Sequence, residues 1–174
     1  SSLTPTAICS NTPIGYTPLS LTNVPTPNFA WTRAAVSGIT PSTGSGTGLI
    51  NESLVNANAT TTNVTYIYTL SINGCSTTNN VIVPIYPDLN LNSGLTPAAI
   101  CNGTTFSYAP TSQVSGVSFT WTRAAITGIT PASNSGTGSI SETLNNSTTA
   151  PITVNYVYTL TANGCSKTNT VSVV

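Results

Sequence analysis

The sequence has very few charged residues. Among 174 residues there are three Lys or Arg and three Asp or Glu, and there is no His. Proteins that bind nucleic acid or an anionic membrane depend on clustered basic side chains. No apolar run approaches the ~20 residues of a membrane-spanning helix. We therefore expect no nucleic acid among the partners and no membrane insertion.

The shortage of titratable side chains also argues against catalysis. General acid–base chemistry needs groups with workable pKa values, and the chain offers no His and a single Lys, Lys167. The paired carboxylates of a glycosidase and the several carboxylates of a calcium site are not available within either half of the chain. We predict that the protein is not an enzyme, has no metal site and needs no cofactor.

The sequence contains an internal repeat. The stretch WTRAAVSGITP begins at Trp31, and WTRAAITGITP begins at Trp121. The openings LTPTAIC and LTPAAIC match as well and end at Cys9 and Cys101. Such duplication indicates tandem domains, which we place at 1–86 and 93–174 with a linker at 87–92. In this alignment Val174 matches Pro84 and Ser1 matches Ser93, which suits two units of a longer array.

Within each copy the pattern is that of β-strands. Val, Ile, Thr and Tyr favour strands, and clusters of Gly, Ser, Pro and Asn interrupt them about every eight to twelve residues. About seven short strands per copy, with a Trp on an early strand, predict an all-β fold of two tandem Ig-like β-sandwich domains. The predicted core residues are Trp31, Trp121, Tyr66, Tyr68, Tyr156 and Tyr158.

Each copy holds two cysteines, one near its start and one in an Asn-Gly-Cys turn. Two cysteines without a His cannot form a four-ligand zinc site within a domain. We therefore expect one disulfide per domain, Cys9–Cys75 and Cys101–Cys165, each worth about 4 kcal/mol in the chain-entropy model. Disulfides persist in oxidising compartments, so the expected location is outside the cell or in a periplasm.

One Arg and one Glu recur at the same offset in both copies. Alternation places Arg33 on the inward face with Trp31, and Glu52 on the apolar face of LINESL. The same holds for Arg123 and Glu142. Because an unpaired buried charge costs several kcal/mol, we predict the ion pairs Arg33–Glu52 and Arg123–Glu142, partly buried and fixing strand register. The alternative is that each Arg contacts an anion or a glycan.

Two surface features could carry a function. Loops 18–28 and 111–117 differ most between the copies, as recognition loops or tolerated insertions do. Asparagines that begin N-x-Ser/Thr triplets are candidate glycosylation sites, although a chain rich in Asn, Ser and Thr also produces such triplets by chance. They are Asn51, Asn58, Asn63, Asn102, Asn145 and Asn146.

These motifs resemble a known family. The opening P-x-A-I-C, the strand F-x-W-T-R-A and the ending Y-x-Y-T-L-x-x-N-G-C are similar to PKD-like Ig-sandwich repeats. Such repeats occur in tandem in large surface proteins of Bacteroidetes-type bacteria, which are exported through the type IX pathway and linked to adhesion or gliding. The resemblance covers both copies and implies a β-sandwich and a secreted or cell-surface location. It implies no active site.

The sequence thus predicts a non-catalytic extracellular structural protein, a tandem-repeat segment of a cell-surface stalk, adhesin or filament. Its expected partners are neighbouring repeats of the same chain or identical subunits. The alternative is an adhesin module that binds surface glycans or host proteins through loops 18–28 and 111–117. A filament subunit that pairs with its neighbours through sheet edges is a third possibility.

Overall fold

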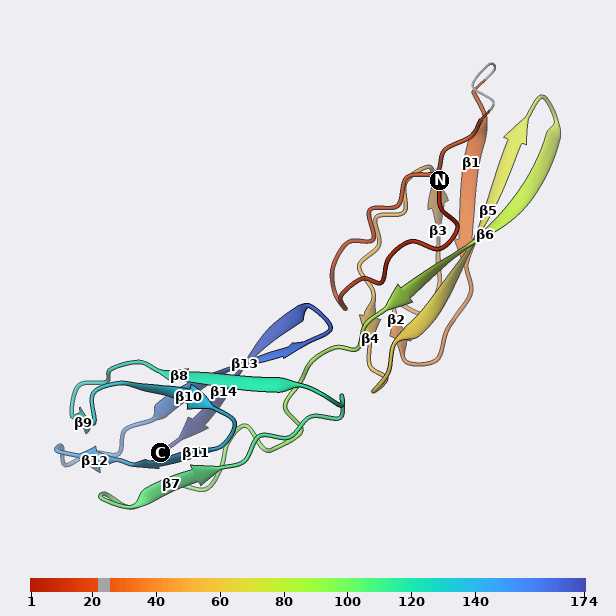
Figure 1. The fold of residues 1–174 in the computed structure, drawn as a ribbon. Helices are drawn as coiled ribbons and strands as arrows, with labels where there is room; N and C mark the ends of the chain where they lie inside the picture. The colour runs from red at the N-terminus through yellow and green to blue at the C-terminus, as the bar shows by residue number, and fades with distance from the viewer. Residues whose placement is uncertain (22–25) are drawn as a thin grey trace. The chain divides into compact units, whose positions relative to one another are not determined.

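The fold is all-β. A computed structural model describes residues 1–21 and 26–174, and these residues form strands and turns but no helix. They divide into two compact units, Ser1–Asp88 and Leu89–Val174, called domain 1 and domain 2 below (Figure 1). The division falls inside the linker predicted at 87–92. Both units are β-sandwiches of the Ig-like type, as the strand pattern predicts.

Domain 1 is built on a main sheet of four antiparallel strands in the order β3-β1-β5-β6, and β2 pairs separately with β4. Isolated bridges from the N-terminal segment, such as Tyr16↔Ile50, complete the second layer. The strands are β1 (Asn28–Arg33), β2 (Ile39–Thr40), β3 (Gly44–Thr47), β4 (Val55–Asn56), β5 (Thr62–Ile72) and β6 (Cys75–Ile85).

Domain 2 repeats this architecture. Its main sheet has the order β10-β8-β13-β14, and the smaller pairs are β11-β7 and β12-β9. The strands are β7 (Thr105–Tyr108), β8 (Ser118–Arg123), β9 (Ile129–Thr130), β10 (Asn134–Thr137), β11 (Ile140–Thr143), β12 (Asn145–Asn146), β13 (Val154–Ala162) and β14 (Cys165–Val173).

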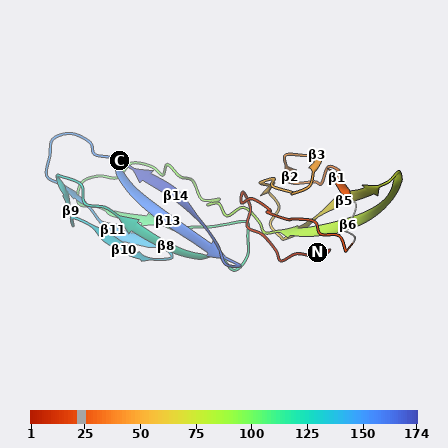
Figure 2. The ribbon, with the colours of Figure 1, turned by 90° about the horizontal axis from the view of Figure 1, so that it is seen from above.

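The last two strands of each domain form a long hairpin, visible in Figure 1 and, from above, in Figure 2. In domain 1 the pairing runs from Thr62↔Ile85 to Ile72↔Cys75. The turn residues Asn73 and Gly74 both have positive φ, 48° and 80°, which is the backbone of the type I′ turn that Asn-Gly favours. Domain 2 has the same Asn-Gly dipeptide in its hairpin turn. In both domains a cysteine directly follows the turn.

The core is lined by alternate residues of the central strands. All six aromatic residues predicted for the core, from Trp31 to Tyr158, are buried. Each tryptophan packs closely against a glycine of the neighbouring edge strand: a Cβ at Gly46 would lie 2.7 Å from Trp31 Cζ2, and one at Gly136 would lie 2.8 Å from Trp121 Cζ2. The repeated Gly in the STGSGTG and ASNSGTG stretches is therefore required by the packing of the repeated Trp.

Candidate functional site

A buried cluster of charged and hydroxyl groups lies at the end of β1. Arg33 donates to Glu52 at two points, from Nε to Oε2 at 3.0 Å and from Nη2 to Oε1 at 3.1 Å. The arginine side chain is fully buried and that of Glu52 is 17% exposed. The Tyr66 hydroxyl donates to Glu52 Oε2 at 2.7 Å. The structure thus brings together the first predicted pair and adds a tyrosine that the sequence pattern had placed only in the core.

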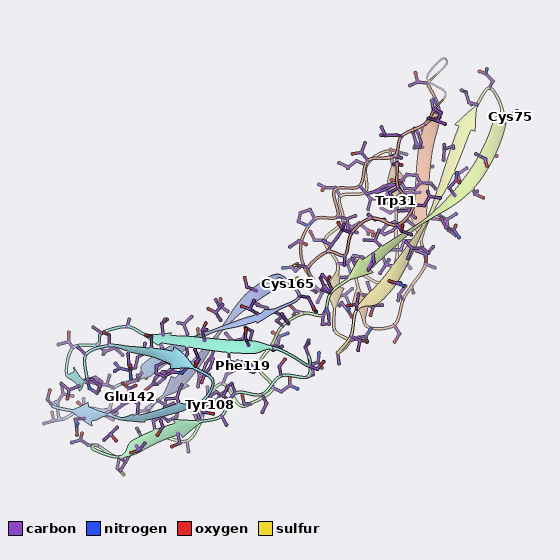
Figure 3. The ribbon with its side chains drawn as sticks, viewed as in Figure 1. Trp31, Cys75, Tyr108, Phe119, Glu142 and Cys165 are labelled. Carbon is purple, nitrogen blue, oxygen red and sulfur yellow. The ribbon has the colours of Figure 1, made fainter. Side chains whose placement is uncertain are left out.

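Domain 2 holds the same cluster with shorter distances. Arg123 Nε lies 2.9 Å from Glu142 Oε2, and Nη2 lies 2.7 Å from Oε1. The Tyr156 hydroxyl donates to Glu142 Oε2 at 2.6 Å, and Asn134 Nδ2 donates to Oε1 at 3.0 Å. The Glu142 side chain is 4% exposed. Figure 3 shows it inside domain 2.

The remaining arginine N–H groups are used by the turn that follows in the sequence. Arg33 Nη2 donates to the carbonyl of Pro41 and Nη1 to that of Ser42. Arg123 contacts the carbonyls of Pro131 and Ala132 in the same way. Because the guanidinium is occupied on several sides by its own domain, the geometry favours a structural role over the alternative of an anion or glycan contact.

The carboxyl and phenol groups of the cluster each keep one protonation state near neutral pH. Burial raises the pKa of Glu142, but hydrogen bonds from Arg123, Tyr156 and Asn134 outweigh it and leave the pKa below the usual 4.5. The pKa of Glu52 is lowered for the same reasons. Burial, reinforced by the neighbouring carboxylate, raises the pKa of the Tyr156 hydroxyl above 10.0. A carboxylate that stays ionised and a phenol that stays protonated serve poorly as acid–base catalysts near neutral pH.

These shifts predict a flat stability profile between about pH 5 and pH 9. A carboxyl with a lowered pKa stabilises the fold above its ordinary pKa of 4.5, and that stability is lost as the pH falls through the folded value. A phenol with a raised pKa stabilises the fold below 10.0, and that stability is lost at higher pH. The sequence has no His to titrate in between.

Thermal midpoints measured from pH 2 to pH 11 would check this profile. We expect a plateau with a fall on each side, and Glu142→Gln should weaken the fall on the acid side while lowering the plateau. A midpoint that changes steeply between pH 6 and pH 8 would show that the titration of other groups governs stability.

The cysteines correct the sequence analysis. Cys75 and Cys101 are free and exposed. The predicted pairs Cys9–Cys75 and Cys101–Cys165 are therefore wrong.

The reason in domain 1 is the length of its hairpin. Cys75 begins β6 at the hairpin tip, labelled in Figure 3. Cys9 lies at the other end of the same strand, because Ile8 N donates to the Pro84 carbonyl and Tyr86 N donates to the Ile8 carbonyl. Ten residues of strand at about 3.3 Å each separate the two ends by roughly 30 Å. A disulfide needs Cα atoms about 4.4–6.8 Å apart.

Domain 2 separates its cysteines in the same way. Cys165 begins β14 beside the Asn163–Gly164 turn. Ile100 N donates to the carbonyl of Val174, so Cys101 lies at the opposite end of that strand. The sequence signal that could have shown this is the Asn-Gly turn itself, because it places its cysteine at the tip of a hairpin, away from the segment that pairs with the end of the last strand.

Both copies of the repeat match the model of a known domain family. The model of the PKD-like domain matches residues 6–88 and again residues 98–174. This chain belongs to the PKD-like domain family. PKD-like domains are typically extracellular modules with structural or adhesive roles and are generally non-catalytic. Searches of curated proteins and of solved structures found no match.

The variable loops differ in how they lie on the two PKD-like domains. In loop 18–28 the side chains of Leu19 and Leu21 are exposed, while residues 22–25 are outside the described residues. In loop 111–117 Val114 is buried. The two loops therefore differ in the exposure of these apolar side chains.

The candidate glycosylation sites fall into two groups. Asn51, Asn63, Asn102 and Asn145 are exposed, whereas Asn58 and Asn146 are half-buried. The side chain of Asn58 donates to the Ser37 carbonyl and to Thr62 Oγ1, and that of Asn146 donates to the Ala150 carbonyl. The exposed four are the candidates whose position on these PKD-like domains suits a glycan.

Two further classes of site are not found in the part of the chain that the structure describes. Residues 1–21 and 26–174 contain no group of three or more His, Cys, Asp or Glu side chains arranged to hold a metal ion. They also contain no helix of the length and apolarity that crossing a membrane requires.

Proposed function

We propose that this protein is a non-catalytic, extracellular structural protein: a tandem-repeat segment of a cell-surface stalk, adhesin or filament, of the kind found in Bacteroidetes-type bacteria. Its partners are neighbouring PKD-like domains of the same chain or of identical subunits. Membership of the PKD-like family, whose domains are typically extracellular, supports the location.

The observation that carries this proposal is the match of the PKD-like domain model to both copies of the repeat, residues 6–88 and 98–174. Each copy forms a compact unit with its own buried Arg–Glu pair, Arg33–Glu52 in domain 1 and Arg123–Glu142 in domain 2. Repeated units of this kind, each with its own core, are the building blocks of structural arrays.

A structural role predicts how the chain responds to a pulling force. Because each domain has its own buried core, we expect the two domains to unfold in separate steps when the chain is pulled from Ser1 and Val174. Unfolding of Leu89–Val174 should release roughly 300 Å of chain, at about 3.5 Å per residue.

Single-molecule force spectroscopy in the presence of a reductant tests the proposal. Arg123→Leu is the matched control, because it removes the buried cation that pairs with Glu142 and should lower the unfolding force of one of the two steps. A wild-type chain that extends smoothly, without discrete unfolding steps, would contradict a load-bearing structural role.

A second candidate is an adhesin module, which the exposure of Leu19 and Leu21 in loop 18–28 favours. Two exposed leucines separated by one residue suit contact with a host protein better than contact with a polar glycan. Leu19→Ser with Leu21→Ser should abolish adhesion to host cells if this loop binds, and should leave it unchanged if the domains serve only as spacers.

A further inference from the structure

Strand β6 is an edge of the main sheet of domain 1, and the half of this edge near the hairpin tip is open. The sheet order β3-β1-β5-β6 leaves one side of β6 without a neighbouring strand. Toward the end of β6 the N-terminal segment covers this side, because Ile82 N donates to the Leu3 carbonyl and the Pro84 carbonyl accepts from the same segment. Among the described residues, 75–80 has no such backbone bond on its outer side.

The alternation of the strand identifies the unused backbone groups. In an antiparallel ladder successive residues point their N–H and C=O groups to opposite sides of the strand. Ile82 points its groups outward, to Leu3. Ser76, Thr78 and Asn80 precede Ile82 by an even number of positions, so their N–H and C=O groups also point outward. The side chains of these three residues are exposed as well.

Domain 2 shows that a chain segment ahead of the domain leaves this edge open. Leu91 N donates to the side-chain oxygen of Asn169 on β14. Asn92 N donates to the Thr111 carbonyl. Within the part of domain 2 that the structure describes, neither residue forms a backbone–backbone bond with β14. The open edge is therefore a feature of the domain itself.

The two copies of this edge differ by one charge. Thr77 pairs with Leu70 in domain 1, and Lys167 pairs with Leu160 at the same place in domain 2. A lysine on an edge strand prevents pairing with another chain, because pairing would bury its charge. Segment 75–80 of domain 1, CSTTNN, has no charged side chain and no proline. The edge of domain 1 thus lacks the protection that domain 2 has.

The open edge of domain 1 is complementary to itself. Antiparallel pairing with a second copy about a two-fold axis at Thr78 sets Thr78 opposite the same residue of the other copy. Ser76 then faces Asn80, and Thr77 faces Asn79. The outward-pointing residues become hydrogen-bonded pairs, each of which exchanges two N–H···O=C bonds. All opposed side chains are uncharged and can hydrogen-bond, and opposed threonines stabilise a sheet.

We propose that the open edge of β6 in domain 1 is an interaction surface for a second copy of this chain, and that residues 76–80 of the two copies pair to join their main sheets into one. This inference rests on the proposed structural function and specifies how identical subunits contact each other. The contact is isologous, so it closes in a dimer of two chains lying side by side.

Sedimentation velocity of the full chain over a range of concentrations tests the pairing. A reductant in the buffer prevents disulfides between the exposed thiols of Cys75. We expect a monomer–dimer equilibrium for the wild-type chain. Thr77→Lys introduces two like charges across the axis and should weaken dimerisation about ten-fold or more. Thr47→Lys, which adds the same charge to the opposite edge strand β3, is the matched control and should leave dimerisation unchanged.

Thr78→Pro tests the role of the backbone. Proline lacks the N–H group and is tolerated on an edge strand where that group faces solvent. The N–H of Thr78 points away from β5, so the substitution preserves the ladder between β5 and β6 and removes hydrogen bonds only from the contact between copies. We expect this variant to stay folded and to be monomeric.

A cysteine at the axis tests the register. In a chain with Cys75→Ser and Cys101→Ser, Thr78→Cys places two thiols on opposed residues whose Cα atoms lie about 5.5 Å apart, within the range of a disulfide. Oxidised glutathione should convert this chain to a covalent dimer. A chain with Cys101→Ser that keeps Cys75 is the off-register control, because its two Cys75 residues lie about 20 Å apart along the paired strands.

The outcomes are distinct from those for the proposed function. A chain that stays monomeric up to millimolar concentration, or a dimer that neither Thr77→Lys nor Thr78→Pro weakens, would overturn the paired edge. The structural function would still stand if the chain unfolds under force in separate steps. Absence of those steps would overturn the structural function, whatever the state of association.

Discussion

Replacing Arg123 with leucine should lower the free energy of unfolding of domain 2 by about 3–5 kcal/mol. The substitution leaves the Glu142 carboxylate, 4% exposed, without the cation that it faces at 2.7 Å. Tyr156 and Asn134 would still donate to the carboxylate, but neither carries a charge. Urea denaturation followed by tryptophan fluorescence measures the change.

The double variant Arg123→Leu with Glu142→Leu should lose less than Arg123→Leu alone. Removing both charges removes the desolvation cost together with the attraction, and buried pairs are often replaced by apolar residues at little cost. Arg33→Leu in domain 1 is the matched comparison, with a smaller loss because the Glu52 side chain is 17% exposed and reaches water. Losses that simply add in the double variant would show that the two charges do not act as a pair.

Trp121→Ala should cost domain 2 about 3–5 kcal/mol, the range for truncating a buried aromatic side chain. The indole is 6% exposed, stands edge-on to Tyr156 with ring centres 5.6 Å apart, and covers Gly136. Its removal leaves a cavity. The strand β8, which carries Trp121, cannot move to close this cavity because it is held in register by β10 and β13 on its two sides.

Trp121→Phe separates packing from hydrogen bonding. Among the described residues, Nε1 of Trp31 and Nε1 of Trp121 are the buried side-chain N or O atoms without a hydrogen-bond partner. Phenylalanine removes that N–H group and keeps most of the ring, so a loss of about 1 kcal/mol is expected. A loss as large as that of Trp121→Ala, measured in the same denaturation experiment, would show that the indole nitrogen has an essential partner.

The features that the sequence predicts well are those set by local alternation. Strand period two placed Arg33 and Trp31 on one face, and the rule that buried charges must be paired led from Arg33 to Glu52. Because the WTRAA stretch is duplicated, the same inference led from Arg123 to Glu142. The aromatic core follows from the same period, since every second residue of β5 and β13 points inward.

The features that the sequence does not predict depend on where segments meet in space. The disulfide pairing failed because the spacing between Cys9 and Cys75 says nothing about which end of β6 each one occupies. The hydrogen bond from Tyr66 to Glu52 depends on a cross-sheet distance that periodicity cannot supply.

The measurement that tests most directly the central claim, that each PKD-like domain of this chain is a structural module with its own core, is denaturation of residues 1–88 and 89–174 as separate chains. The account predicts that each separate chain unfolds cooperatively, with a midpoint close to that of the same domain in the whole chain, because each has its own buried core and its own Arg–Glu pair. A separate chain that is unfolded under conditions in which the whole chain is folded would contradict it.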